Sequence, residues 1–323
     1  MQGMTEKWLA LVLAGSTCLA PALAHADFPS KPVTIVVPYA PGGGADLLAR
    51  LISEDVSSRL GVPVLVENRP GGGGTIATRA VANANPDGYT VLTTTSATIV
   101  MNPHLYDNLP YDSKKDFAPV TLASSMPMVI AVNPDFPVKT LDELTAHVRA
   151  NPGKISYAFG ATGGQIVGEL YRDGANLDMQ GIAYNGSTPA QTDVVGGHLP
   201  IIVDALAPAL SLLTSGRLRP LAVSSAERAA VLPDVPSLQE AGFADIDVGG
   251  WTGFAVPAGT PQANIDKLHD AIAGALNTPK VRQKLESLGQ TVFAVPGPEY
   301  QERIDRDYDV LGEVIRKAGI KAN

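Results

Sequence analysis

Short apolar runs with strand character alternate with helix-like runs along most of the chain, and this alternation limits the folds open to it. The strand-like runs are residues 33–37, 62–66, 90–94, 155–159, 200–204 and 218–224. The apolar positions of 47–60 fall on one face of a helix, and residues 261–277, 280–288 and 298–317 are predicted as three further helices. The pattern predicts an α/β fold with mainly parallel sheets, in which ligands bind beyond the carboxyl ends of the strands. Residues 102–120 are predicted to form an irregular surface connection.

Two glycine-rich turns join strand-like to helix-like runs near the start of this pattern. The first is Pro41-Gly42-Gly43-Gly44-Ala45-Asp46, and the second spans residues 68–75 with four consecutive glycines. Glycine lets the backbone turn tightly and approach a ligand without a side chain in the way. A helix that begins at such a turn presents unpaired N–H groups and a partial positive charge. Each turn therefore predicts an anion site made of backbone, with a tight corner that holds no ligand as the alternative.

Small polar residues mark three further junctions between strand-like and helix-like runs. They lie at residues 95–98, 159–165 and 184–188. Hydroxyls at such positions can contact a ligand, but they also cap helices. For Ser187 or Thr188 alone, capping is the simpler explanation.

The first 26 residues have the pattern of a secretory signal. Lys7 gives a weak basic start, an apolar stretch follows, and Ala24-His25-Ala26 is a small-x-small cleavage site. We expect cleavage after Ala26. The only cysteine, Cys18, would leave with this segment, which would exclude disulfides, thiol catalysis and thiolate metal sites. No later segment is long and apolar enough to span a bilayer, so direct membrane insertion is not expected.

The charge of the chain limits its partners. The formal net charge is −8, and no basic stripe is present to hold phosphates, so nucleic acid is a poor candidate partner. The same net charge would repel an anionic ligand. Any attraction must therefore be local, which screening over about 8 Å at physiological salt permits.

Enzyme sites find little support among the motifs. The first glycine turn lacks the Gly-Lys-Ser/Thr ending of a P-loop, the second matches a dinucleotide pattern only loosely, and no Gly-x-Ser-x-Gly elbow occurs. No metal, cofactor or catalytic residue is predicted, because the histidines of the expected mature chain are not paired at metal-ligand spacing. Asp46 and Asp204 could form a paired-carboxylate site, but a charge in a first helical turn is the simpler reading of Asp46. The partner of Asp204 could be a ligand group, an ordered water or the backbone. Core packing is favoured over ligand stacking for Trp251.

Several longer motifs are highly specific when taken together. They include Val37-Pro38-Tyr39-Ala40-Pro41-Gly42-Gly43, Asp46 followed by Arg50, Val66-Glu67-Asn68-Arg69-Pro70-Gly71, Asn85-Pro86-Asp87-Gly88-Tyr89-Thr90, Leu232-Pro233-Asp234-Val235-Pro236, and Trp251 with Pro257-Ala258-Gly259-Thr260-Pro261. In these motifs the chain resembles the tripartite tricarboxylate transporter substrate-binding proteins, the Bug family of periplasmic receptors, from Phe28 to about Gly319. The resemblance implies a two-lobed periplasmic binding protein of type II-like fold, each lobe a mainly parallel sheet flanked by helices, with a hinge between them. We assign 27–127 plus 248–323 to lobe 1 and 128–247 to lobe 2.

The resemblance also implies a ligand and a site. Family members capture small carboxylates, which they hold with backbone amides, hydroxyls and ordered waters rather than with an arginine clamp. The first binding loop corresponds here to 39–46, the opposing loops to 160–165 and 184–188, and Asp204 to a cleft aspartate. With the hydroxyls of residues 96 and 98, the predicted ligand-binding residues are Tyr39, Pro41, Gly42, Gly43, Ala45, Asp46, Ser96, Thr98, Gly160, Ala161, Thr162, Gly163, Gln165, Tyr184, Asn185, Gly186 and Asp204.

The sequence thus predicts a monomeric periplasmic receptor for a small aliphatic or aromatic mono- or dicarboxylate, working with a tripartite tricarboxylate-type transporter. The extra glycine at Gly44 and the segment 161–164 depart from the family pattern, so the identity of the acid stays open. A sensory protein that presents its liganded form to a membrane signalling receptor would use the same cleft. The sequence leaves both roles open.

Overall fold

The computed structural model describes residues 28–160, 162–184, 186–243, 249–317, 319 and 321. The predicted signal segment with its cleavage site lies outside the described residues, as do Ala161 and Asn185. The elements are β1 (Val33–Val37), α1 (Gly44–Leu60), β2 (Val64–Asn68), the 3-10 turn η1 (Gly72–Gly74), α2 (Thr75–Ala82), β3 (Thr90–Thr95), the π-helical turn η2 (Ala97–Met101), α3 (Asn102–Leu105), β4 (Phe117–Val132), α4 (Leu141–Ala150), β5 (Ile155–Phe159), α5 (Thr162–Gly174), β6 (Met179–Ala183), α6 (Ser187–Val195), β7 (Ile201–Ala205), α7 (Leu206–Thr214), β8 (Arg219–Val223), β9 (Gly249–Pro257), α8 (Gln262–Leu276), α9 (Pro279–Glu286), β10 (Thr291–Pro296) and α10 (Gly297–Lys317).

The strands form one mixed sheet in the order β2-β1-β3-β9-β4-β7-β5-β6, with β8 and β10 also paired to β4. At each end of this order the neighbours are parallel: β1 pairs with β2 and β3, and β5 pairs with β6 and β7. The strands β4 and β9 in the centre run antiparallel to their neighbours. The predicted α/β fold is confirmed, and the antiparallel centre is an addition that the alternation did not indicate.

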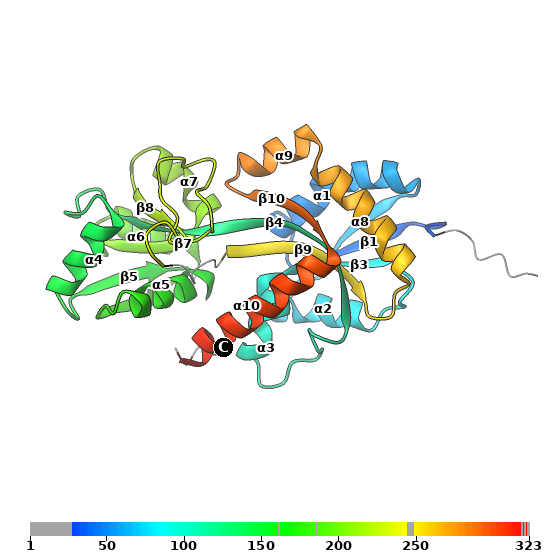
Figure 1. Ribbon diagram of the computed structural model, residues 1–323, viewed down its shortest axis with the longest axis horizontal. Helices are drawn as coiled ribbons and strands as arrows, with labels where there is room; N and C mark the ends of the chain where they lie inside the picture. The colour runs from blue at the N-terminus through cyan, green and yellow to red at the C-terminus, as the bar shows by residue number, and fades with distance from the viewer. Residues whose placement is uncertain are drawn as a thin grey trace, which may run out of the picture.

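Strand β4 joins two halves of the molecule, which lie side by side in Figure 1. Its residues 117–127 pair with β9, whereas its residues 128–132 pair with β7. We call β1, β2, β3, β9 and β10, with their helices, the first half, and β5 to β8, with theirs, the second half. Helix α10 packs against η2 in the first half and against α5 in the second. The predicted lobe boundaries themselves stay a prediction.

Helices cover both faces of the sheet because the strand side chains alternate between its faces. In β1, Ile35 and Val37 pack toward α1 and α8, while Val36 belongs to the cluster that contains α2 and α10 residues. This second cluster continues along β4 to α4 and α5, so one core connects the two halves. Trp251 lies in it with 1% of its surface exposed, in an edge-on contact with Tyr300 at 5.3 Å. Its predicted core role is confirmed.

The segment 102–120 differs from its prediction. It begins with helix α3 and ends inside β4, and between them Tyr111 is buried and donates to the Thr98 carbonyl oxygen at 2.5 Å. Strand β4 was not predicted from the sequence because it contains Pro119. Proline cannot donate to a sheet ladder and usually avoids central strands. The pairing with β9 shifts register just after this proline, between Pro119 and Thr121, which accommodates it.

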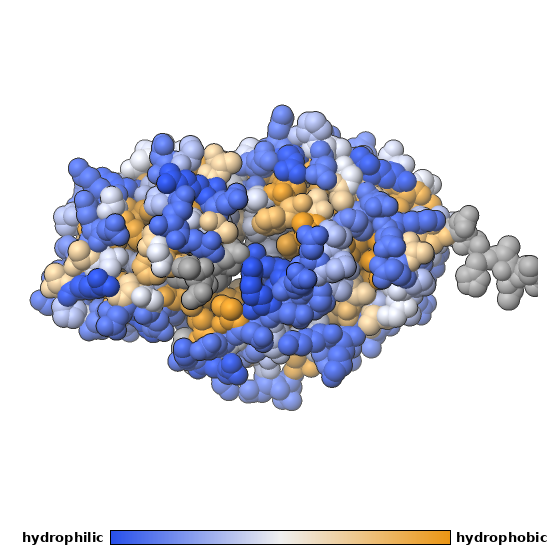
Figure 2. All heavy atoms as spheres, in the orientation of Figure 1, coloured by the Kyte–Doolittle hydropathy of each residue, from blue (hydrophilic) through white to orange (hydrophobic). Residues whose placement is uncertain are grey.

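The surface of the face drawn in Figure 2 is mainly hydrophilic, with apolar residues gathered over β10, where Phe293 is exposed. No helix in the described part of the chain is long and apolar enough to cross a membrane.

Candidate functional site

The carboxyl ends of β1, β2 and β3 meet at one edge of the sheet, because these three strands are parallel neighbours. The loops that follow them are held together by side chains. The Tyr39 hydroxyl lies 3.0 Å from Thr95 Oγ1, and Asn68 Nδ2 donates to the Tyr39 carbonyl oxygen at 3.0 Å. Burial raises the pKa of Tyr39 more than its bond to Thr95 lowers it, so this hydroxyl stays protonated at neutral pH. The predicted loop 39–46 therefore lies beside the predicted hydroxyl segment 95–98.

The hydroxyl groups of that segment have different partners. Thr98 Oγ1 bonds the backbone of Thr95 at 3.1 Å and is fully buried, which fits a local turn. Ser96 is 4% exposed, and its hydroxyl forms no hydrogen bond within the described chain. Of these two predicted ligand-binding residues, Ser96 is thus the one with an uncommitted hydroxyl.

Helix α1 begins in the first glycine turn and leaves donors free there. Gly42 has φ 92°, a left-handed conformation that favours glycine, and Leu47 N makes the first helical bond to the Gly43 carbonyl at 2.9 Å. The amides of Gly43, Gly44, Ala45 and Asp46 donate to no other residue that the structure describes. This is the arrangement of main-chain donors that binds anions at a helix N-terminus.

The buried carboxylate of Asp46 holds this turn by accepting hydrogen bonds from its backbone and from two neighbouring side chains. It is 4% exposed; its Oδ2 accepts from Gly42 N at 2.9 Å, and its Oδ1 accepts from Arg50 Nε and Asn68 Nδ2, each at 2.9 Å. Burial alone would raise the pKa of Asp46, but these hydrogen bonds and the charge of Arg50 outweigh it and hold the pKa below its usual range. Asp46 is therefore an ionised anchor of the loop.

The second glycine turn is closed only in part by bonds of its own, since the amides of Gly71, Gly72 and Gly73 donate to no residue that the structure describes. Gly74 N donates to the Gly71 carbonyl at 3.0 Å, and the amide of Thr75 donates to the Gly72 carbonyl. Outside the turn, Asn102 Nδ2 donates to the Gly73 carbonyl at 3.1 Å. These bonds fit the tight-corner alternative.

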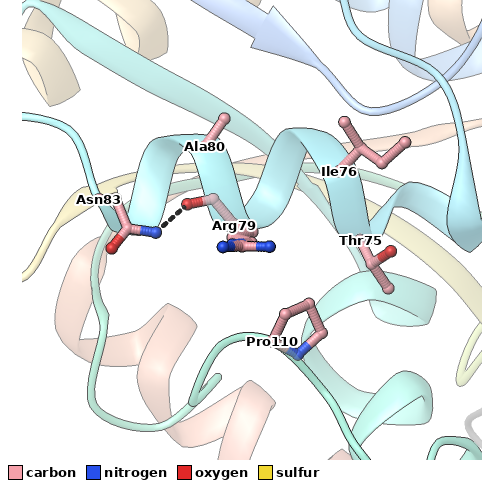
Figure 3. Close-up of a pocket in the computed structure, with 6 residues that line it drawn as sticks. All are labelled: Thr75, Ile76, Arg79, Ala80, Asn83 and Pro110. Carbon is pink, nitrogen blue, oxygen red and sulfur yellow. Dashed lines mark hydrogen bonds between the residues drawn. The ribbon is translucent and has the colours of Figure 1, made fainter.

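A shallow hollow of about 320 Å³ lies beside α2 (Figure 3). It is lined by Thr75, Ile76, Arg79, Ala80, Asn83 and Pro110. None of these is a predicted ligand-binding residue. The dashed line in Figure 3 marks the hydrogen bond that Asn83 Nδ2, just after α2, donates to the Arg79 carbonyl oxygen at 2.8 Å.

In the second half, the carboxyl ends of β5, β6 and β7 meet in the same way. A Cβ on Gly160 would collide with the backbone of Gly186 and Ser187, so the loops after β5 and β6 touch through a position that only glycine can fill. A Cβ on Gly163 would lie 2.8 Å from Met128 Cε, which places the start of α5 against β4. Thr162 and Gln165 are half-buried in the first turn of α5.

Asp204 anchors this half as Asp46 anchors the first. It is 1% exposed; its Oδ1 accepts from Ser187 Oγ at 2.6 Å and from Ala205 N at 2.8 Å, and its Oδ2 accepts from Gln191 Nε2 at 2.8 Å. Its partners thus include the backbone, one of the alternatives that the sequence left open. Tyr184 donates to Asp193 Oδ2 at 2.5 Å, and this bond, with burial, raises the pKa of Tyr184.

The predicted ligand-binding residues therefore gather at the ends of parallel strands in both halves, apart from the two outside the described residues. The sequence marked the segments 68–75 and 95–98, but the predicted ligand-binding residues did not include Asn68, Arg50 or Thr95, although Asn68 directly ends β2 and Thr95 ends β3. Among the residues that the structure describes, no three His, Cys, Asp or Glu side chains gather as a metal site would require.

Comparison with known proteins is consistent with this geometry. The family profile described as "Tripartite tricarboxylate transporter family receptor" matches residues 48–320. The chain is 32% identical to the protein BugT of Bordetella pertussis over 318 residues, which covers 97% of each protein.

Solved structures show the same fold. The chain is similar to the periplasmic binding protein BugD, with 34% identity, a TM-score of 0.71, and coverage of 92% of this chain and 100% of that one. It is similar to an R. palustris protein solved with adipate (30% identity, TM-score 0.75, coverage 91% and 99%). It is also similar to MatC from Rhodopseudomonas palustris with bound malate (34% identity, TM-score 0.69, coverage 88% and 100%).

These matches confirm the periplasmic-binding-protein fold, and they identify a family of solute receptors rather than enzymes. By its family profile, its Bug relatives and its fold, this chain belongs to the tripartite tricarboxylate transporter receptors of the Bug family.

Proposed function

We propose that this protein captures a small mono- or dicarboxylate in the periplasm for uptake by a tripartite tricarboxylate-type transporter. The ligand lies between the two halves, which act as the lobes of a hinged clamp with boundaries near residues 127 and 247. The signal segment is removed after Ala26, and the mature protein works as a monomer. Two structural neighbours, solved with adipate and malate, support the choice of ligand class.

One observation carries this proposal. The amides of Gly43, Gly44, Ala45 and Asp46 donate to no other residue that the structure describes. Free amides at a helix N-terminus select negative charge, and a carboxylate can accept several of them through its two oxygens.

Both halves are needed on energetic grounds. Micromolar affinity requires about −8 kcal/mol. One helix N-terminus contributes roughly 0.3–1 kcal/mol, or about 2 kcal/mol when partly buried. Hydrogen bonds to a charged group, at about 1.5–3 kcal/mol each, must supply the rest once closure excludes water. The amides of the first half and the loops 160–165 and 184–188 of the second half therefore act together, and binding shifts the protein toward its closed form.

A thermal-shift panel tests the ligand class. The panel contains malate, succinate, adipate, pimelate and benzoate, with adipamide as the uncharged control of matched length. An acid at 100 times its dissociation constant adds about 2.7 kcal/mol, which raises the melting temperature by roughly 4 °C. Adipamide should give no shift. A flat response to every acid would refute carboxylate capture.

Uptake is tested in cells. Deleting the gene should abolish growth on the acid that the panel identifies, and the deletion should leave transcriptional responses to that acid intact. Normal growth on the acid, with the transcriptional response to it lost, would instead assign the protein to sensing.

A further inference from the structure

Building on the proposed carboxylate site, we propose that Arg50 is a positioning residue that neutralises the buried charge of Asp46 and holds the loop 39–43, so that the free amides of α1 can accept an anion.

Arg50, Asp46 and Asn68 form a closed ring in which each side chain bonds the other two. Arg50 Nε donates to Asp46 Oδ1 at 2.9 Å, Asn68 Nδ2 donates to the same oxygen at 2.9 Å, and Arg50 Nη2 donates to Asn68 Oδ1 at 2.8 Å. The ring therefore joins the first two turns of α1 to the end of β2.

The ring also holds both ends of the binding loop. Asn68 Nδ2 reaches the carbonyl oxygen of Tyr39 at 3.0 Å, and Asp46 Oδ2 receives the amide of Gly42 at 2.9 Å. These two bonds fix the backbone on either side of Pro41, directly before the free amides. Loss of the ring would let the loop move relative to the helix.

Charge gives Arg50 its second role. Asp46 is a carboxylate in the same helical turn that is to accept an anion, and at 4% exposure water screens it poorly. A like charge at this place would repel the ligand. Arg50 forms an ion pair with it at 2.9 Å. The other charged groups at this strand end, Glu67 and Arg69, pair with each other at 2.7 Å and leave Asp46 to Arg50.

Among the described residues of the second half, no cation bonds Asp204. The three groups that bond Asp204 are a hydroxyl, a side-chain amide and a backbone amide, all neutral. The ring around Asp46 therefore makes the α1 turn a more favourable place to bind a carboxylate than the turn beside Asp204.

Isothermal titration with the panel acid that gives the largest thermal shift tests the inference. Arg50→Met should weaken binding by about tenfold or more. Arg50→Lys, which keeps the charge but loses the fork that bonds both Asp46 and Asn68, should bind with an affinity between those of Arg50→Met and wild type. Arg282→Met is the matched control, because Arg282 also bonds a carboxylate and an asparagine but lies outside the site: it pairs with Glu286 of α9 at 3.6 Å and with Asn277, at the end of α8, at 2.8 Å. It should leave affinity unchanged, and melting curves without ligand verify that each variant folds.

A double-mutant cycle separates charge from scaffolding. The double variant Asp46→Asn/Arg50→Met, in which the local charge is again neutral, should bind within about threefold of wild type. A double variant as weak as Arg50→Met would overturn neutralisation and leave Arg50 only the role of holding the loop, and no loss in Arg50→Met would overturn both roles. If wild type binds none of the panel acids, the proposed function fails and this inference with it. Binding by wild type and Arg50→Met alike refutes this inference alone.

Discussion

At the scale of single residues, Gly44 allows one free amide to be removed without disturbing the helix. It is the first helical residue of α1, follows Gly43 in an extended conformation with ψ 169°, and has open space where a Cβ would stand. Proline is tolerated at this position and lacks only the N–H. Gly44→Pro should therefore weaken carboxylate binding by about 10–150-fold, the range of one hydrogen bond to a charged group, with little change in unfolding free energy. Gly44→Ala keeps the amide and serves as the control in the same titration. Equal affinity of the two variants would mean that this amide does not hold the ligand.

At the scale of elements, helix α6 depends on Asp204. The helix has nine residues, its N-cap is Gly186, and no side chain caps it, so it is too short to be stable alone. Asp204 at the end of β7 bonds both Ser187 and Gln191 of this helix. Asp204→Ala should lower the unfolding free energy by about 1–3 kcal/mol in urea titrations, because it leaves half-buried donors unpaired. Asp204→Asn keeps one carbonyl oxygen for Ser187 and should cost clearly less. Similar losses in both variants would show that the charge, not the bonding geometry, holds α6.

At the scale of elements, some strands could be predicted from the sequence and others could not. Strands β1, β3 and β5 were predictable because short apolar runs and turn signals bound them, and the binding loops followed from their place at strand ends. Strand β9 was not predicted from the sequence, because its glycines suggest a turn. They serve packing instead: a Cβ on Gly253 would lie 2.7 Å from the Tyr300 ring of α10. The ring of Asp46, Arg50 and Asn68 was not predicted from the sequence. Asn68 lies 18 positions from Arg50 and 22 from Asp46, and the pairing of β1 with β2 brings it to them.

At the scale of the whole molecule, two halves share one core. Strand β4 runs through both and α10 packs on both, so the proposed closure would have to bend β4 and move α10 relative to α5. A compact chain of this length has a radius of gyration of about 19 Å. Small-angle scattering should give a larger value for the free protein and a decrease toward 19 Å when the panel acid is added. Gly44→Pro, which loses a contact in one half only, should require more acid for the same decrease. A radius that does not change at saturating acid would show that the ligand binds to a rigid molecule, and that the affinity does not come from closure.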